Sequence, residues 1–165
     1  MASVILFFFL VGVAFCGVIH NERTAQFEGK VWLGKWESTD RRFNYEAFAT
    51  VLGHGHPGAR DPHHKNFIKF WKEDDHFHLK VTVPEISYKM ELEFTMGMQS
   101  KSTFNGTSFT YTFSEDGDIL KSENFIPSRN LTIFDTYRVN GTEMEVHSKV
   151  GDIESTRWYK KDTQP

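Results

Sequence analysis

Cysteine is almost absent from this sequence of 165 residues, and Cys16 is its one example. A single cysteine excludes an intramolecular disulfide, although small secreted domains often depend on disulfides for stability. Such a chain must bury a core large enough to hold its fold without cross-links. A domain of about 150 residues buries roughly two-thirds of its unfolded surface, so we expect one domain held together by its own core.

Long apolar runs are also scarce, and the clearest one lies near the N-terminus. Val4–Phe15 is apolar apart from Gly12, but it is too short for a transmembrane helix of about 20 residues. The run is typical of a secretory signal peptide, with small Ala14 and Cys16 placed for a cut before Gly17. No Lys or Arg precedes it, so a cut after Gly17 and a buried N-terminal strand are the alternatives.

The predicted organisation of the chain follows from this run. We expect residues 1–16 to be a signal peptide, residues 17–30 a flexible N-terminal segment, and residues 31–165 the folded domain. The protein is then secreted and extracellular, and cleavage removes the only thiol.

Charge of one sign and catalytic motifs are lacking too. The 19 Lys and Arg residues are interspersed with 22 Asp and Glu residues, without the basic block typical of nucleic-acid binding. The sequence has no Gly-x-Ser-x-Gly elbow and no phosphate-binding loop. Carboxylate pairs such as Asp74-Asp75 fall in predicted turns. We therefore expect neither an enzyme nor a cofactor.

Apolar side chains alternate with polar ones along much of the chain, which is the signal of strands with one buried face. The buried faces predicted in this way are Phe77-Leu79-Val81-Val83, Met90-Leu92-Phe94-Met96, Phe109-Tyr111-Phe113 and Met144-Val146. Roughly eight strands fit between Asn66 and Lys160, and one more fits around Trp32 to Trp36.

Short turn signals separate these strands, including Asn105-Gly106, Asn140-Gly141 and Gly151-Asp152. Asn-Gly pairs accept the positive φ angles of tight hairpins, so the strands form an antiparallel up-and-down meander. A long meander has two exposed edges unless it closes on itself. A mainly β protein with a closed barrel is the favoured fold, and a sandwich is the alternative.

The segment 44–52 breaks the β pattern and is predicted to be a short helix. Asn44 is placed to cap it, and Gly53 to end it. The stretch 54–64 is rich in Gly, Pro and His, and it forms either a loop or a second helix that begins near Pro62. Its histidines have no Cys or acidic partner at a recognised spacing, so we expect a solvated loop and no metal.

This order of elements resembles the fatty-acid-binding protein family over Trp32 to Lys160. The matching residues are Leu33-Gly34-Lys35-Trp36, Asn44–Gly53, Phe94-x-x-Gly97 and Arg157-Trp158-Tyr159. The resemblance implies a ten-stranded antiparallel up-and-down β-barrel with a helix-turn-helix cap and an internal cavity.

A second resemblance is to the secretory-abundant heat-soluble proteins of tardigrades. It is carried by 31–38 (VWLGKWES) and by 97–109, which begins Gly-Met-Gln-Ser. This resemblance implies a secreted, heat-soluble stress-response protein that protects extracellular components or secretory compartments during desiccation. Weak contact with membranes or client proteins on drying would follow, and we expect a monomer. An extracellular carrier of fatty acids or other small amphiphiles is the alternative function.

The resemblance also points to a ligand site on the last strand. Arg157 and Tyr159 share one face of that strand, where the matching pair of the family holds a carboxylate; Arg suits this task because its fork binds two oxygens. Arg157 could instead pair with Asp135 or face solvent. Thr136 stands where many members have a second Arg, and a register shift would let Arg138 supply it.

The cavity of such a barrel would be lined by apolar faces of the strands. We expect the lining to include Met90, Leu92, Phe94, Phe109, Tyr111 and Met144. The same side chains could fill a solid core instead, but the width of a ten-stranded barrel favours a cavity.

Three sequons complete the predicted sites. Asn105, Asn130 and Asn140 each begin an Asn-x-Thr triplet, which is an acceptor for N-glycans in a secreted chain. Asn105 and Asn140 fall in predicted hairpin turns, where Asn-Gly can equally serve the turn alone.

Overall fold

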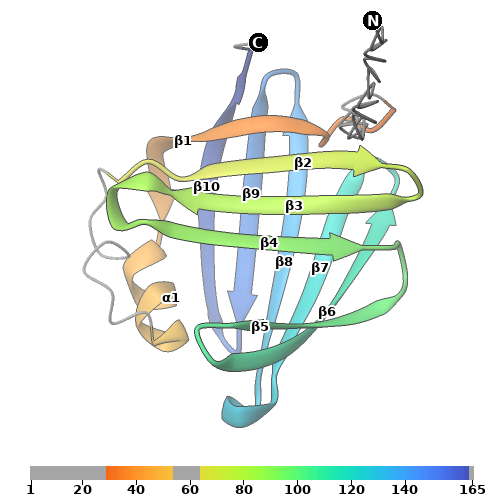
Figure 1. Cartoon of the computed structure of the whole chain (residues 1–165). Coiled ribbons are helices and arrows are strands. Elements are labelled where there is room, and N and C mark those ends of the chain that lie inside the picture. Colours follow the sequence, from red (N-terminus) through yellow and green to blue (C-terminus); the bar gives the residue numbers. More distant parts are fainter. Residues whose placement is uncertain (1–28, 54–63, 164–165) are drawn as a thin grey trace, which may run out of the picture.

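The computed structural model describes residues 29–53 and 64–163, which form a nearly closed antiparallel β-barrel of ten strands (Figure 1). The hydrogen-bonded order is β4-β3-β2-β1-β10-β9-β8-β7-β6-β5. The strands are β1 (Gly34–Phe43), β2 (Phe67–Glu73), β3 (His76–Val83), β4 (Tyr88–Phe94), β5 (Gln99–Phe104), β6 (Thr107–Asp116), β7 (Ile119–Ile126), β8 (Leu131–Asn140), β9 (Glu143–Val150) and β10 (Ile153–Asp162). The described residues also form α1 (Tyr45–Leu52) and the short 3-10 helices η1 (Pro84–Ile86) and η2 (Pro127–Arg129). The predicted ten-stranded barrel is confirmed.

Tight hairpins give the meander its register. Asn105 and Gly106 have φ angles of 47° and 78°, the positive pair that a two-residue turn needs to match the twist of its strands. The strands on either side of this turn are in register, with Phe104 opposite Thr107. The Asn-Gly turn predicted at this position is therefore confirmed.

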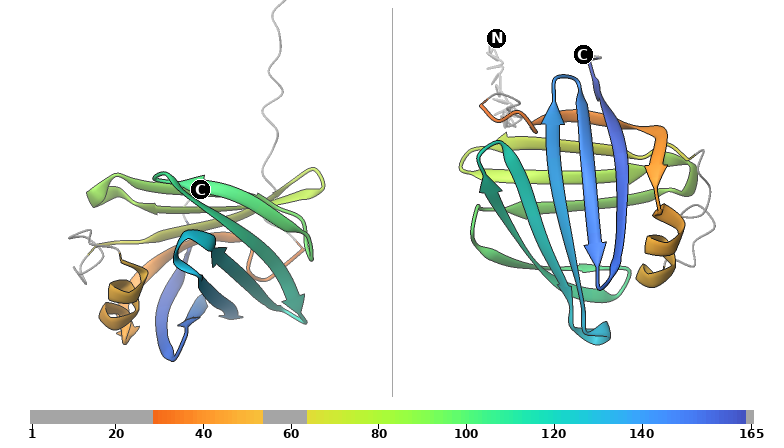
Figure 2. Two further views of the ribbon diagram at one scale, coloured as in Figure 1. Left: turned by 90° about the horizontal axis from the view of Figure 1, so that it is seen from below. Right: turned by 180° about the vertical axis from the view of Figure 1, so that it is seen from behind.

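Strand β1 joins the two halves of the barrel. Its first residues pair with β2, and its register with β10 shifts between Ser38 and Arg42. A shift of this kind bends a strand, and the bend delivers the chain to α1 beside one end of the barrel (Figure 2).

Helix α1 forms where the sequence predicts it, and Gly53 ends it with a φ of 67°. The predicted cap is wrong, because Asn44 makes no capping bond and its Nδ2 donates instead to the carbonyl of Glu154, 2.9 Å away. The predicted second helix near Pro62 and the signal peptide lie outside the described residues.

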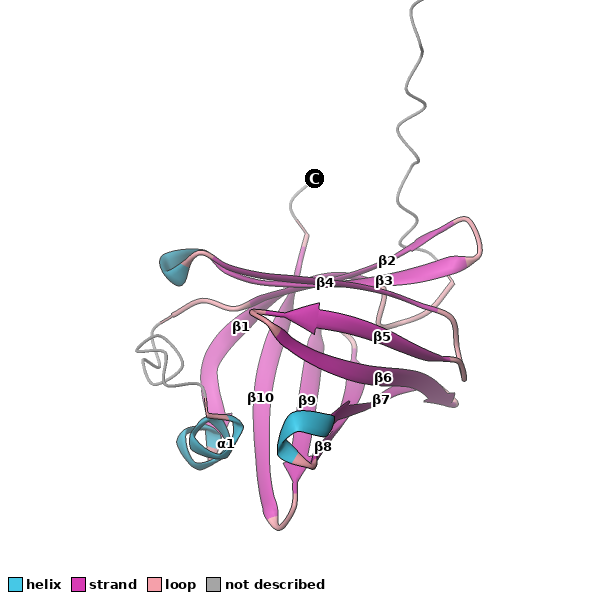
Figure 3. Ribbon diagram, turned by 60° about the horizontal axis from the view of Figure 1, so that its bottom comes forward, coloured by secondary structure: helices cyan, strands magenta, loops and turns pink. Residues whose placement is uncertain are grey.

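The barrel has one seam, between the end strands β4 and β5, which share no backbone ladder (Figure 3). The hydroxyl of Tyr111 crosses it and donates to the carbonyl of Glu93 at 2.7 Å. The rings of Tyr88 and Phe104 also meet across the seam, with centroids 5.0 Å apart.

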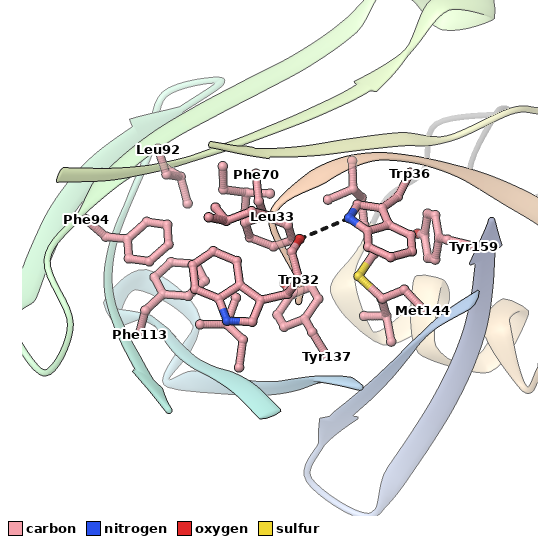
Figure 4. Close-up of a cluster of buried hydrophobic side chains, with 14 of the residues drawn as sticks. Trp32, Leu33, Trp36, Phe70, Leu92, Phe94, Phe113, Tyr137, Met144 and Tyr159 are labelled. Carbon is pink, nitrogen blue, oxygen red and sulfur yellow. Dashed lines mark hydrogen bonds between the residues drawn. The ribbon is translucent and has the colours of Figure 1, made fainter. Parts of the chain in front are cut away.

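Aromatic side chains fill the half of the barrel that is remote from α1. Trp32, Trp36, Phe70, Phe94 and Phe113 are fully buried there, and the rings of Phe94 and Phe113 stack with centroids 3.8 Å apart (Figure 4). The indole nitrogen of Trp36 donates to the carbonyl of Trp32 at 3.0 Å. Packing of this kind leaves room for a cavity only in the other half.

Candidate ligand cavity

A cavity of about 460 Å³ occupies the half of the barrel next to α1. Its deep wall includes the buried side chains of Leu79, Leu92 and Ser122. Its exposed wall residues are Gly53, Asn105 and Arg129, which belong to the end of α1, the β5–β6 turn and η2. The cavity therefore opens between these three segments.

The residues predicted to line a cavity divide into two groups. Met90, Leu92 and Phe109 are on the cavity wall. Phe94, Tyr111 and Met144 are instead buried in the core, which corrects their predicted place on the wall. Phe94 and Met144 lie at the ends of β4 and β9 that are remote from α1, whereas Tyr111 spans the seam. The barrel is thus hollow at one end and solid at the other.

Arg157 and Tyr159 face the interior, as their spacing on β10 predicts, but neither is on the cavity wall. Nη2 of Arg157 donates to Ser38 Oγ at 3.3 Å and to the carbonyl of His64 at 3.2 Å, and its guanidinium lies 4.9 Å from the ring centroid of Tyr45. Arg157 is 8% exposed, and its Nε is buried without a hydrogen-bond partner among the described residues. Burial also raises the pKa of Tyr159, so its hydroxyl stays protonated.

Asp135 is a charged residue of the cavity wall that sequence reasoning considered only as a partner for Arg157. Its Oδ1 accepts a bond from Ser148 Oγ at 2.6 Å, and its Oδ2 accepts bonds from Ser122 Oγ and Asn124 Nδ2, both at 3.1 Å. Burial raises the pKa of this carboxyl, and the bonds from Ser148 and Ser122 oppose the rise. The expected pairing with Arg157 is wrong, because neutral donors surround the acid.

These donors come together through the register of three adjacent strands. Ser122 on β7 lies opposite Asp135 on β8, which in turn lies opposite Ser148 on β9. Side chains directly opposite each other in a sheet are close enough to interact. The sequence signal is a polar residue at an inward position of each strand, but only the register shows that the three meet.

Arg138 does not face the cavity, so its predicted place there is wrong. Tyr137 is buried and takes the inward position, and its neighbours in the strand therefore point outward. The side chain of Arg138 is 55% exposed, and its Nη1 lies 3.6 Å from Glu145 Oε1 on the neighbouring strand. Thr136 shares this outer face.

Arg129 connects two sides of the cavity mouth. Its Nη2 donates to the carbonyl of Val51 at 2.6 Å, and its Nη1 donates to the carbonyl of Leu52. Both acceptors are free carbonyls at the C-terminal end of α1, where a cation is favoured. Arg129 thereby ties η2 to α1.

The three sequons lie at opposite ends of the barrel. Asn105 is on the cavity wall at the mouth, and Asn130 follows Arg129 directly. Asn140 ends β8 at the other end of that strand. All three asparagines are exposed, so each is accessible for the predicted modification, which stays a prediction.

Histidine and acidic side chains do not gather into a metal site in the described ranges 29–53 and 64–163. No group of three or more His, Cys, Asp or Glu side chains there could hold a metal ion. His54, His56 and His63 of the predicted loop lie outside the described part of the chain. No helix in the same ranges is long and apolar enough to cross a membrane.

No protein-family model matches this chain. Among known proteins, it is similar to secretory-abundant heat soluble protein 1 of Ramazzottius varieornatus, with 44% identity over 145 residues, 86% of this chain and 83% of the relative. It is also similar to secretory-abundant heat soluble protein 64681 of a Hypsibius species, with 40% identity over 165 residues, 98% of this chain and 95% of the relative.

Solved structures show the same likeness. A crystal structure of a secretory-abundant heat-soluble protein from Ramazzottius varieornatus, from a dimer sample, has a TM-score of 0.80 and 44% identity, and covers 83% of this chain and 99% of its own. A Schistosoma mansoni fatty acid binding protein in complex with arachidonic acid has a TM-score of 0.71 and 18% identity, and covers 81% of this chain and 97% of its own. The second likeness concerns the fold alone.

Proposed function

The chain belongs to the secretory-abundant heat-soluble protein family of tardigrades, and from this we propose that it is a secreted protectant that shields extracellular components or secretory compartments during desiccation. The names of its relatives support secretion and heat solubility. In this role the protein acts by contact with membranes or other proteins, not as an enzyme.

The outer wall of the barrel is the observation that carries this proposal. Charges of both signs pair along it, as in Lys121 with Asp116 at 2.7 Å and Lys149 with Glu154 at 3.2 Å. The large apolar side chains exposed among the described residues are on separate segments: Val31, Phe43, Met98 and Phe134. A charged surface without a large apolar patch favours solubility at high concentration.

Protection on drying can be measured directly. A labile enzyme or dye-loaded liposomes would be dried and rehydrated with this protein, or with an equal mass of a globular protein that does not protect. We expect higher recovered activity or retained dye with this protein. Recovery equal to that of the control would refute the protectant function.

A second candidate function is that of an extracellular carrier of fatty acids or other small amphiphiles, and the cavity favours it. Its volume lies within the range of small-molecule sites, about 300–1,000 Å³. Met90, Leu92, Phe109 and Ile133 supply apolar wall for a hydrocarbon tail.

Filling the cavity separates the two candidates. In Ile133→Trp, a large ring takes up space on the wall, and circular dichroism would check that the barrel remains folded. We expect this variant to lose binding of a fluorescent fatty acid and to keep its protection on drying. The predicted role of Arg157 and Tyr159 in holding a carboxylate is tested in the same assay. Unchanged binding in Arg157→Ala would remove that role.

A further inference from the structure

The cavity wall has two residues that carry charge, Arg129 and Asp135. Arg129 lies at the exposed mouth, and its two terminal nitrogens donate to the carbonyls of Val51 and Leu52. Asp135 lies deeper, between the strands that carry Ser122 and Ser148. Among the described residues, the acid therefore sets the charge of the inner wall.

Asp135 retains room for one more hydrogen bond. An ionised carboxylate offers about four acceptor sites, and Ser148, Ser122 and Asn124 occupy three of them. All three partners are neutral donors, and no ion pair among the described residues includes Asp135. A buried carboxylate with only neutral partners keeps an uncompensated charge, which is costly.

The position of Asp135 fits a head group at the inner end of the cavity. Ile133, two residues nearer the mouth on β8, is apolar wall, whereas Tyr137, two residues deeper, is buried. A ligand lying along β8 would place its polar end at Asp135 and its tail past Ile133 and Phe109 toward the mouth. A carboxylate head group would bring like charges together, but an ammonium would pair with the acid.

We propose that the cavity takes a protonated long-chain amine, and that Asp135 binds its head group with support from Ser122, Ser148 and Asn124. This inference rests on the proposed uptake of amphiphiles by the cavity and reverses the expected charge of their head group. Arg157 does not compete for this role, because its Nη2 donates to Ser38 and to the carbonyl of His64 away from the cavity wall.

Calorimetric titration of the whole protein tests the proposal with ligands that differ only in their head group. Decylamine, decanol and decanoate would each be titrated near neutral pH, below the concentrations at which they form micelles. We expect decylamine to bind at least about tenfold more tightly than decanoate, the gain of one charge-assisted hydrogen bond. Decanol should fall between them, because its hydroxyl donates without a charge.

Two isosteric variants separate the cavity acid from the general charge of the protein. Asp135→Asn should bind decylamine about tenfold more weakly and decanol within about twofold of the wild type. Asp118→Asn removes an exposed acid from the β6–β7 turn and should leave both affinities unchanged. The comparison of head groups on the wild type decides the question even if Asp135→Asn fails to fold.

The outcomes distinguish this inference from the functions on which it rests. Decanoate binding as tightly as decylamine, or full decylamine affinity in Asp135→Asn, would overturn the role of Asp135 while leaving the cavity as an amphiphile site. Absence of binding by all three ligands would refute the carrier function, and this inference with it. Neither result bears on protection during drying.

Discussion

The seam of the barrel gives the sharpest test of the structure. Tyr111→Phe removes the hydroxyl that donates to the carbonyl of Glu93 at 2.7 Å and keeps the ring in the core. A neutral hydrogen bond contributes about 0.5–1.5 kcal/mol to the free energy of unfolding. Glu93 is exposed on an end strand, so water can take the place of the hydroxyl. The expected loss is therefore in the lower part of that range, about 0.5–1 kcal/mol.

Urea unfolding followed by tryptophan fluorescence measures this loss, and a thermal scan checks it, with an expected fall in Tm of about 2–4 °C for a domain of this size. Tyr88→Phe is the matched control, because the Tyr88 hydroxyl has only a weak contact with the sulfur of Met90 at 3.9 Å. Equal unfolding free energies for the two variants would refute the role of the Tyr111 bond in holding the seam.

Three other changes test separate parts of the molecule. Gly34→Ala should lower the free energy of unfolding by about 1–3 kcal/mol in urea, because its φ of 137° is strained for any residue with a Cβ; an unchanged midpoint would contradict this. Arg129→Ala should speed amide hydrogen exchange in α1 more than in the barrel, since it releases the tie to η2. In a glycosylating host, Asn130→Gln should strengthen amphiphile binding by removing a glycan beside the mouth, whereas Asn140→Gln, at the other end of β8, should not.

Much of the fold could be predicted because its signals are local. Alternation places buried and exposed side chains within one strand, and Asn105-Gly106 determines a turn by the conformations those two residues accept. Strand β5 shows where this fails: Gln99–Phe104 has a single apolar residue, at its end, so period-two alternation is missing. Closure into ten strands came from the family resemblance and not from periodicity.

The site was less predictable because it depends on contacts between strands. Arg138 was placed on the wrong face, since the direction of a side chain reverses when a register changes by one residue. Asn44 has the composition of a helix cap, but its side chain bonds to the carbonyl of Glu154 on β10 instead. No pattern within one segment places Ser122, Asp135 and Ser148 side by side, because their meeting requires two registers at once.

The division of the barrel into a packed half and a hollow half separates two kinds of mutation along the same strand. On β6, changes to Phe113 disturb the stacked rings and should lower the folding yield, whereas changes to Phe109 reshape the space near the mouth. Homologues can therefore diverge in what they hold while sharing one folding nucleus. For protein engineering, the mouth end is the region to randomise and the aromatic end the region to leave fixed.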